Sequence, residues 1–525
     1  MPDAIVIGAG PNGLAGANLL ADAGWSVLVL EANDEPGGAV RTAEVTAPGF
    51  RNDTLSAFYP FGAASPVLRS LGLDRHGLRW VHAPAVLAHP TPDGPAAVLH
   101  LDIDQTAASL DKFASGDGDA WRELYGRFDR IAEPFLDAML SPFPPVRAGL
   151  RLGAKLRGGV LDFTRFALLS ARRMSAESFR GDGGGLLITG NAMHTDISPE
   201  GVGSGVLGWV LACLGQRVGF PVPEGGAQRL IDALVARLRA QGGTVQCGAR
   251  VERVLVERGR AIGVQLADGE KVRATKAVLA DTDAVVLYER LVGLDHLPPR
   301  VAGAIERFER GPGTVKIDWA LSSPIPWADE AVREAGTVHV GNSLGEMSIT
   351  AAQLAAGVVP DRPFVLVGQM TTTDPTRSPA GTESAWAYAH VPNGRADDAG
   401  PDGITGSWDE RETEAFVRRM EDRIEAHAPG FRDRIIARHV FNPPALEAAN
   451  ANLVGGDLSG GTAQPHQELI FRPILGLARS ETPIKGLYLA SSSAHPGPGV
   501  HGACGANAAK AAVAHDRLSR RHAAT

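Results

Sequence analysis

The opening residues 3–42 carry the pattern that most restricts how this chain can fold. A short apolar run, Ala4–Ile7, has the length and composition of a strand buried on both faces. Glycines at positions 8, 10 and 13 follow, then a segment with helical spacing, a second apolar run over residues 26–30, and Glu31. This order of strand, glycine loop, helix, strand and acid predicts a dinucleotide-binding unit.

Each residue of this motif has a physical role. Gly8 permits the tight turn, Gly10 lets the backbone approach a pyrophosphate, and Gly13 lets the helix and the strand pack closely. The N-terminus of the helix directs its free N–H groups and the positive end of its dipole at the phosphates. Glu31 lies where a carboxylate can accept hydrogen bonds from a ribose diol.

A second glycine motif, over residues 203–208, has the same spacing but lacks a preceding strand and a following strand-terminal acid. Because a dinucleotide site needs that context, we interpret it as a loop that enters an apolar helix. The chain therefore contains one dinucleotide motif.

The residues after Glu31 indicate which dinucleotide is bound. Gly37 and Gly38 can bring the backbone close to a bulky ligand, and Arg41 can contact a phosphate with its planar guanidinium. This stretch resembles the GGxxRT extension of the phytoene desaturase and flavin amine oxidase superfamily, whose ligand is FAD. Residues 12–14, 486–491 and 507–509 resemble the same superfamily. Within it, the chain most resembles the bacterial phytoene-dehydrogenase-like oxidoreductases, over nearly its whole length.

The resemblance implies FAD as the cofactor, with a site built from both ends of the chain. It implies that the backbone at Val251 meets the adenine, and that a helix from Ala503 points its N-terminus at the pyrimidine edge of the isoalloxazine. Such a helix end stabilises negative charge on a reduced flavin. Ser491 stands where the family usually has a glycine or an acid, and its hydroxyl or backbone can contact the pyrophosphate. The predicted FAD-binding residues are Gly8, Gly10, Asn12, Gly13, Glu31, Ala32, Gly37, Gly38, Arg41, Val251, Ser491, Gly499, Val500 and His501.

The length of 525 residues, with 44% hydrophobic composition, is too large for one ordinary core, so we expect two interleaved domains. We predict an α/β fold: a Rossmann-like FAD-binding domain interleaved with an α+β substrate domain that contains an antiparallel sheet. The FAD-binding domain is expected over residues 1–75, 222–290 and 480–525, and the substrate-binding domain over residues 76–221 and 291–479. Residues 76–220 are predicted to be mostly helical, and the antiparallel strands are expected between residues 314 and 440.

Composition excludes several classes of protein. A net charge of −8 argues against a nucleic-acid binder, which usually presents a basic face. The three cysteines are too few and too scattered for a disulfide framework or a zinc cluster, which fits a reducing compartment. No apolar run has the length of a membrane span, and a strand that begins at Ala4 leaves no room for a signal peptide. We therefore expect a cytoplasmic protein without a metal site.

Residues 146–173 form a basic, amphipathic stretch in an otherwise acidic chain. One interpretation is peripheral contact with an anionic membrane, which would admit a substrate dissolved in the lipid. The other is a solvated helix face on the substrate domain, which charge runs usually indicate.

Several side chains beyond the cofactor site are candidates for chemistry. His495 belongs to a His-Pro pair that we interpret as a loop element, whereas His501 suits acid–base chemistry and a structural role equally. Cys504 is a candidate for a covalent flavin bond, but the covalent motif of such amine oxidases is absent and small buried cysteines are common. His194 suits a pocket or a helix end equally. No metalloprotease, dithiol or α/β-hydrolase motif occurs, so no catalytic side chain is assigned.

These patterns favour an oxidoreductase that removes a hydride from a C–H bond of an apolar, isoprenoid- or carotenoid-like substrate and leaves a double bond. A flavin amine oxidase is the nearest alternative, and it would need an aromatic cage beside the flavin. A non-catalytic FAD-binding regulator or chaperone is the alternative from another class. No second nucleotide-binding unit or redox-active cysteine pair is visible, which favours oxygen or a quinone as the electron acceptor. The oligomeric state is left open.

Overall fold

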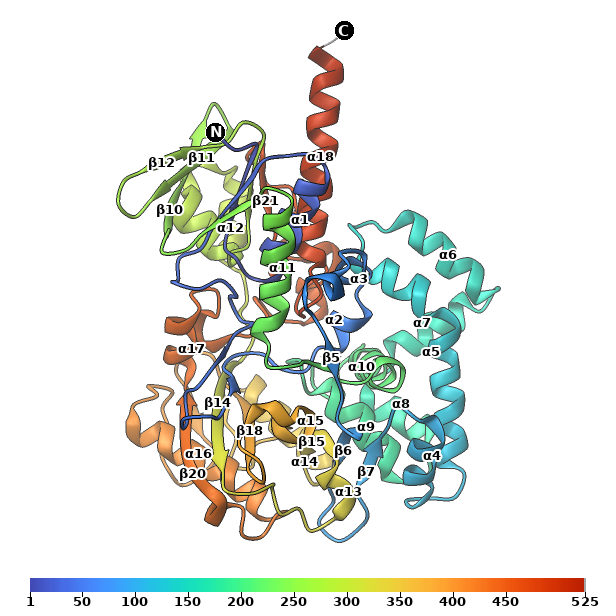
Figure 1. Ribbon diagram of the computed structural model, residues 1–525. Coiled ribbons are helices and arrows are strands. Elements are labelled where there is room, and N and C mark those ends of the chain that lie inside the picture. The colour runs from blue at the N-terminus through green and yellow to red at the C-terminus, as the bar shows by residue number, and fades with distance from the viewer. Residues whose placement is uncertain (524–525) are drawn as a thin grey trace.

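Two sheets organise the protein, whose computed structural model describes residues 1–523 (Figure 1). The first sheet has five parallel strands in the order β21-β13-β1-β2-β9. Its strands are β1 (Ala4–Ile7), β2 (Val27–Leu30), β9 (Thr244–Gln246), β13 (Ala277–Ala280) and β21 (Leu487–Leu489). Segments that are far apart in the sequence therefore lie side by side in this sheet.

Both faces of the first sheet are covered, as parallel strands with continuous apolar runs require. One face packs against three helices: α1 (Pro11–Asp22), α11 (Gln228–Ala240) and α18 (Ala503–Ala523). The other packs against a small antiparallel sheet of three strands: β10 (Val251–Glu257), β11 (Arg260–Leu266) and β12 (Lys271–Arg273). The sheet is thus the middle layer of a three-layer unit.

Helices α1 and α18 cross in close contact near their N-terminal ends. A Cβ on Gly505 would lie 1.7 Å from the carbonyl oxygen of Asn12, and a Cβ on Gly16 would lie 2.9 Å from the carbonyl oxygen of Gly505. Only glycine fits at such separations. The crossing therefore brings the N-termini of both helices to the same edge of the first sheet.

The second sheet has seven strands in the order β20-β14-β18-β17-β15-β6-β7, and only β15 and β6 pair in parallel. Its strands are β6 (Ala85–His89), β7 (Ala97–Leu99), β14 (Gly313–Leu321), β15 (Ala335–Val340), β17 (Val365–Gln369), β18 (Glu383–Val391) and β20 (Ile435–Phe441). Strands β6 and β7 lie in the segment expected to be mostly helical. Their apolar runs are too short for periodicity to separate a strand from a helix.

The second sheet has one apolar and one polar face. The odd-numbered residues of β14 and β18 pack against α16 (Glu410–Glu425) in a hydrophobic core. The pairing register puts the even-numbered residues of both strands together on the opposite face. We call this the inner face, because the ring of Phe58, on the segment that leaves the first sheet, lies 6.1 Å from that of Trp386. Its residues on these two strands are Thr314, Lys316, Asp318, Ala320, Ser384, Trp386, Tyr388 and His390.

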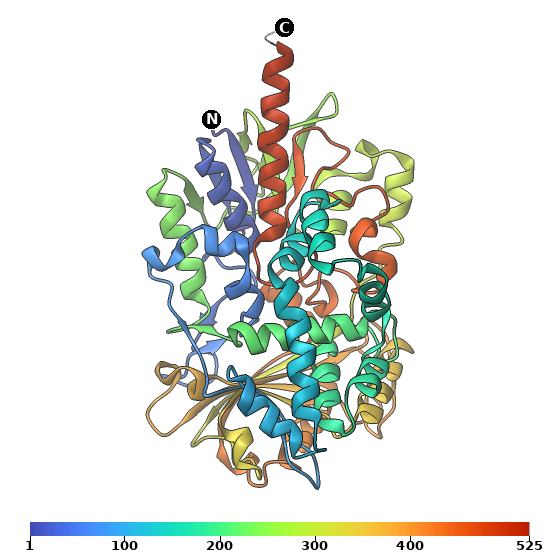
Figure 2. The same cartoon turned by 90° about the vertical axis from the view of Figure 1, so that its right-hand side faces the viewer.

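A layer of helices packs beside the second sheet (Figures 1 and 2). These are α4 (Ile103–Asp111), α5 (Asp117–Leu140), α6 (Val146–Leu156), α7 (Val160–Leu168), α8 (Ala171–Ser178), α9 (Asp182–Ala192) and α10 (Ser204–Val218). Their common core is centred on Trp209, whose ring meets those of Phe128 and Phe166 edge to face at 5.4 and 4.9 Å. Since α10 begins directly after Gly203, the apolar helix is present as predicted, but residues 204–208 of the second glycine motif form its first turns and not a loop before it.

Within residues 1–523, no helix combines the length and the apolar character that a bilayer crossing requires. The same residues contain no group of three or more His, Cys, Asp or Glu side chains arranged to hold a metal ion.

Candidate cofactor and active site

Four parallel strands end at one edge of the first sheet. Gly8 follows β1, Glu31 follows β2, Asp281 follows β13, and Ser491 lies just beyond β21. Ligands of open α/β sheets bind outside this edge. The fold thus brings together predicted residues from both ends of the chain and adds Asp281, which was not expected from the sequence.

The glycine loop over residues 8–13 and the pair Gly37 and Gly38 lie against each other with no room for side chains. A Cβ on Gly13 would lie 2.2 Å from the carbonyl oxygen of Gly8. A Cβ on Gly38, whose φ is +56°, would lie 3.1 Å from the Cα of Gly10. The Gly37 N–H also donates a hydrogen bond to the glycine loop, at 3.0 Å. These contacts leave a cradle that is bare backbone at the N-terminus of α1.

Glu31 is fixed at the sheet edge by its own carboxylate. One oxygen accepts the Ala9 N–H at 2.8 Å and the other accepts a second backbone N–H at 2.9 Å. Each oxygen keeps a lone pair for a further donor. Ala32 is exposed beside it, and Val251 begins β10 two residues after Ala249, whose N–H donates to the Glu31 carbonyl at 2.7 Å.

Asp281 places a carboxyl group at the N-terminus of α1. Its Oδ2 accepts the Gly13 N–H at 2.7 Å, and a Cβ on Gly10 would meet the same oxygen at 2.9 Å. Burial raises the pKa of this carboxyl to about 7, against the lowering effect of the Gly13 hydrogen bond. The only signal in the sequence was an acid directly after the buried run 276–280.

Two polar atoms beside the cradle are buried without a hydrogen-bond partner among the described residues. They are Oδ1 of Asn12 and Nε of Arg41. The Arg41 side chain is held in place by its Nη2, which donates to the carbonyl oxygen of Ala449 at 3.0 Å. A free guanidinium N–H next to a helix N-terminus is the donor set that a phosphate group needs. The residues therefore fit the pyrophosphate of a dinucleotide.

The loop over residues 491–502 closes the site between β21 and α18. Ser491 is buried, and its hydroxyl oxygen accepts a backbone N–H at 3.3 Å. His501 Nδ1 accepts the Ala503 N–H at 3.0 Å, and burial lowers the pKa of this imidazole to about 4. A neutral His501 therefore caps α18, which is the structural one of its two predicted roles. Gly499 is exposed and Val500 half-buried next to it.

The remaining candidates in this loop are held by carbonyl groups. The Cys504 Sγ lies 3.6 Å from two carbonyl oxygens, and burial raises the pKa of the thiol to about 12. Since the thiolate is the nucleophile, this neutral thiol is poorly suited to a covalent flavin bond. His495 Nε2 lies 3.1 Å from the carbonyl oxygen of Ser141, in keeping with a loop element.

A buried ion pair on the inner face was missed at the sequence level. Lys316 Nζ lies 2.6 Å from both carboxylate oxygens of Asp318 and 5.9 Å from the Trp386 ring centroid. Burial lowers the pKa of the lysine and raises that of Asp318 to about 6. The negative charge of Asp53 lies close enough to raise the pKa of both groups. Asp53 also accepts a hydrogen bond from the Thr42 hydroxyl, so the ion pair lies near the segment that follows Arg41. Strand alternation was the available signal, since residues two apart share a face.

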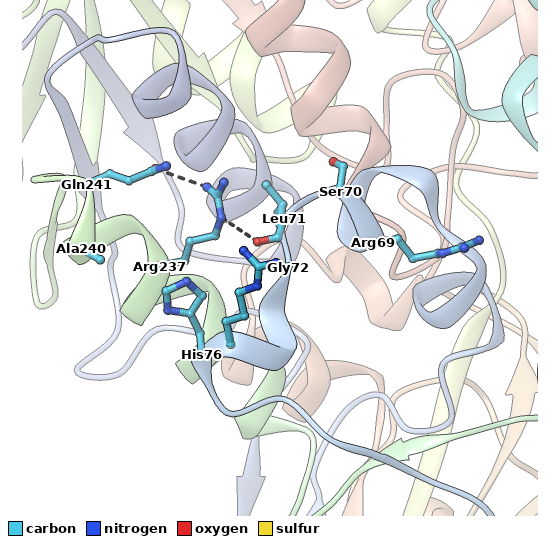
Figure 3. A pocket seen from close by; sticks show the side chains of 9 residues that line it. Arg69, Ser70, Leu71, Gly72, His76, Arg237, Ala240 and Gln241 are labelled. Carbon is cyan, nitrogen blue, oxygen red and sulfur yellow. Dashed lines mark hydrogen bonds between the residues drawn. The ribbon is translucent and has the colours of Figure 1, made fainter.

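A surface pocket lies elsewhere, between α11 and the loop after α3 (Pro66–Ser70) (Figure 3). It is lined by Arg69, Ser70, Leu71, Gly72, Arg75, His76, Arg237, Ala240 and Gln241. Arg237 donates to the Leu71 carbonyl at 2.8 Å and to both Asp22 carboxylate oxygens at 3.0 and 3.1 Å. This arginine joins α1, α3 and α11, so we interpret the pocket as structural.

Known proteins share this sequence pattern and fold. The sequence model of the family "Flavin containing amine oxidoreductase" matches residues 12–371, and the chain belongs to that family. It is 28% identical to pyridine nucleotide-disulfide oxidoreductase domain-containing protein 2 of Mus musculus, over 97% of this chain and 92% of that protein. It is 25% identical to the lycopene-forming phytoene desaturase of Pseudescherichia vulneris, over 96% of each chain.

Among solved structures, an oxidoreductase from Methanosarcina mazei shares the fold with a TM-score of 0.63 at 16% identity, over 97% of this chain and 99% of that chain. The family membership confirms the predicted class and cofactor: the protein is an FAD-dependent oxidoreductase. It also confirms the predicted resemblance to phytoene desaturases and flavin amine oxidases.

Proposed function

We propose that FAD binds along the carboxyl edge of the first sheet, held by the residues predicted from the sequence. Glu31 and the backbone at Val251 would hold the adenosine end, and the glycine cradle with Arg41 would hold the pyrophosphate. The loop 491–502 would hold the flavin end. The cradle of bare backbone and the unpartnered Arg41 Nε support this assignment. The division into domains is also a proposal, supported by the origin of all five parallel strands in residues 1–75, 222–290 and 480–525.

We further propose that the reaction removes a hydride from a C–H bond of an apolar, isoprenoid-like substrate and creates a double bond. FAD, when bound, supplies the hydride acceptor. The protein would bury the substrate between the loop 491–502 and the inner face, orient it and exclude water. The observation that carries this proposal is a row of three aromatic rings beside the site. The ring centroid of Trp386 lies 6.1 Å from that of Phe58 on one side and 5.9 Å from that of Tyr388 on the other. The similarity to a phytoene desaturase over almost the whole chain gives it further support.

The amine alternative finds less support. An amine oxidase would need aromatic rings on both sides of the substrate next to the flavin. The loop 491–502 contains no Phe, Tyr or Trp. The aromatic row Phe58, Trp386 and Tyr388 lies on the other wall, two of its rings on β18 and the third on the segment that leaves the first sheet.

Anaerobic bleaching of the flavin tests this proposal. The purified yellow protein is mixed with isoprenoid hydrocarbons, isoprenoid alcohols and amines, and the flavin absorbance is followed without oxygen. We expect bleaching by isoprenoids and none by amines. Bleaching by amines alone would refute the proposal. Stopped-flow reoxidation of the bleached protein with oxygen and with a quinone then tests the proposed acceptors.

We also propose that residues 146–173 rest on an anionic membrane. Leu150 on α6 is 71% exposed and Leu161 on α7 is 83% exposed, which is unusual for large apolar side chains. Arg147, Lys155 and Arg157 form no ion pair among the described residues, so their charges are free for lipid phosphates. The N-terminal base of this stretch adjoins the site, since the loop before α6 contacts His495 through Ser141 and Phe143.

Vesicle flotation tests the membrane proposal. The double variant Leu150→Ser, Leu161→Ser should lose binding to vesicles that contain phosphatidylserine. The matched control is Ile349→Ser, Ile436→Ser, which removes two apolar side chains of 62% and 54% exposure outside this stretch. Equal flotation of both double variants, or no flotation of the wild type in low salt, would contradict the proposal.

A further inference from the structure

A side chain of the protein already occupies part of the cradle at the N-terminus of α1. Asp281, which follows β13, directs a carboxyl oxygen into it, and this Oδ2 accepts the Gly13 N–H at 2.7 Å. Cβ atoms on Gly10 and Gly13 would lie 2.9 and 3.1 Å from the same oxygen. In this motif, the N–H groups of the first helical turn are the donors that a pyrophosphate uses. The Asp281 carboxyl group therefore stands beside the proposed position of the phosphates.

The backbone of Asp281 is fixed on several sides. Its N–H donates to the carbonyl oxygen of Ile7 at 2.8 Å, and its own carbonyl oxygen accepts from Asn452 Nδ2 at 3.0 Å. A Cβ on Gly8 would lie 2.9 Å from that carbonyl oxygen, so the chain has no space to shift there. Asp281 is also only 8% exposed. A bound pyrophosphate must therefore be compatible with this carboxyl group where it is.

The two carboxyl oxygens of Asp281 differ in their surroundings. Oδ2 is engaged by the Gly13 N–H. Oδ1 accepts no hydrogen bond in the described part of the chain, and it is not fully buried. It is therefore the oxygen that a ligand in the cradle can reach.

The charged groups around the cradle disfavour a further anion. Burial and, to a smaller extent, the carboxylate of Glu31 at the end of β2 raise the pKa of Asp281 to about 7. Cys504 on α18 also faces Asp281, but burial raises its pKa to about 12, so the thiol is neutral. Arg41, the basic side chain beside the cradle, donates to the Ala449 carbonyl and not to Asp281. With both acids ionised, one guanidinium would face two carboxylates as well as the charges of a pyrophosphate.

Protonation turns Asp281 from an obstacle into a ligand. A neutral carboxyl group has an O–H donor as well as an acceptor oxygen, whereas a carboxylate only accepts. With the hydrogen on Oδ1, Oδ2 can keep the Gly13 N–H while Oδ1–H donates to a phosphate oxygen. Without that hydrogen, two sets of lone pairs would face each other across the cradle.

We infer that Asp281 holds the pyrophosphate of FAD as a neutral carboxylic acid, through a hydrogen bond from Oδ1–H to a phosphate oxygen, and that the protein takes up a proton on this residue when FAD binds. The inference rests on the proposed position of FAD and adds a binding residue that the glycine motif does not contain. The proton comes from the solvent, and the O–H bond is the only covalent bond that forms. FAD therefore binds more tightly in mildly acidic solution.

Fluorescence titrations of the flavin-free protein with FAD at pH 6 and pH 8 test the inference. Only the fraction of protein with a neutral Asp281 is ready to bind, and for a pKa of about 7 this fraction falls roughly tenfold between the two pH values. The Kd of the wild type should therefore rise roughly tenfold from pH 6 to pH 8. Asp93→Asn, which changes an exposed carboxyl group outside the site, should show the same rise.

Two variants separate the charge from the donor. Asp281→Asn imitates the neutral acid, because its amide oxygen can accept the Gly13 N–H and its amide N–H can donate in place of Oδ1–H. Its Kd should be the same at both pH values and close to that of the wild type at pH 6. Asp281→Ala removes the charge and the donor together. It should also lose the pH dependence, but it should bind FAD roughly tenfold more weakly than Asp281→Asn. Equal Kd values of the two variants would overturn the donor role.

Titration calorimetry of the wild type measures the proton directly. At pH 8, binding enthalpies in two buffers of different ionisation enthalpy should show an uptake of nearly one proton per FAD, and at pH 5 almost none. Asp281→Asn should show no uptake at either pH. A wild type that binds FAD at pH 8 without taking up a proton would overturn the inference.

The outcomes also separate this inference from the proposed position of FAD. If the Kd of the wild type is independent of pH while Arg41→Met weakens binding, the position stands and the inference falls. If neither Arg41→Met nor the two Asp281 variants change the Kd, both fall.

Discussion

Replacing Asp281 by asparagine should remove a titrating group from the N-terminus of α1 without changing its shape. The amide oxygen of Asp281→Asn can still accept the Gly13 N–H that the carboxyl oxygen accepts at 2.7 Å. The variant loses only the charge. Any change that depends on pH therefore reports the ionisation of this one carboxyl.

The size of the effect follows from the burial of this carboxyl. Burial raises the Asp281 pKa from 3.8 to about 7, so the ionised form destabilises the folded state by roughly 4 kcal/mol. The sign is that of an acid with a raised pKa. The free energy of unfolding is therefore unaffected by this group below pH 4. It falls as the pH rises from 4 to 7, and it stays at the lower value above pH 7. Relative to the wild type, the asparagine variant should gain about 2.5 kcal/mol between pH 5 and pH 8.

Urea unfolding of the flavin-free protein at pH 5, 6, 7 and 8 measures this gain. Asp93→Asn, an exposed carboxyl, serves as the control and should show no such slope. At pH 8 the Asp281→Asn variant should also bind FAD more tightly than the wild type, since the pyrophosphate then meets no carboxylate. A stability difference that stays constant from pH 5 to pH 8 would refute the reasoning.

Three further predictions concern the same site. Gly505→Ala should destabilise the protein by about 3 kcal/mol in thermal unfolding, because there is no space for the Cβ of the alanine. Gly126→Ala on α5, where space is open, should not lower the melting temperature. Equal melting temperatures of the two variants would contradict this prediction. Arg41→Met should weaken FAD binding roughly 10- to 100-fold in a fluorescence titration, because it removes a charged donor beside the cradle; an unchanged Kd would argue against the proposed pyrophosphate position. Cys504 should react with iodoacetamide at pH 8 far more slowly than Cys247 in the folded protein, because Cys504 is fully buried and its thiol pKa is about 12, whereas Cys247 is half-buried and its pKa is raised less. Acid should release all FAD, and yellow colour retained in the acid precipitate would disprove this.

Local pattern was enough to predict the first sheet and most of the second. The run Ala4–Ile7 is short, continuous and apolar, and the glycines and Glu31 follow it at fixed spacing, so the context was contained in one stretch. The strands of the second sheet near residues 314–321 and 385–391 were visible because apolar residues alternate there. Strands β6 and β7 were not visible, because their apolar runs are shorter than the window that periodicity needs.

The missing site residues depend on contacts between distant segments. Asp281 matters because β13 is the neighbour of β1, and the order of strands in a sheet cannot be read from local sequence. Lys316 and Asp318 become a buried pair only when β14 lies between β18 and β20. His194 suited a pocket and a helix end equally well at the level of the sequence. In the structure its ring contacts that of His339, 145 positions further along the chain, and such a contact cannot be read from local sequence.

The order of strands in the first sheet also governs how the protein is made. Strand β1 pairs with β13, which pairs with β21, so the sheet is complete only when residues near 487 have left the ribosome. At ordinary rates of synthesis, this comes roughly half a minute to a minute and a half after β1 emerges. Until residues near 280 have emerged, β1 lacks its partner β13, and from then until residues near 487 emerge the edge of β13 lacks its partner β21. Each open edge is exposed to wrong associations. The loop 491–502 follows β21, so the proposed cofactor site is also complete only at this late stage of synthesis.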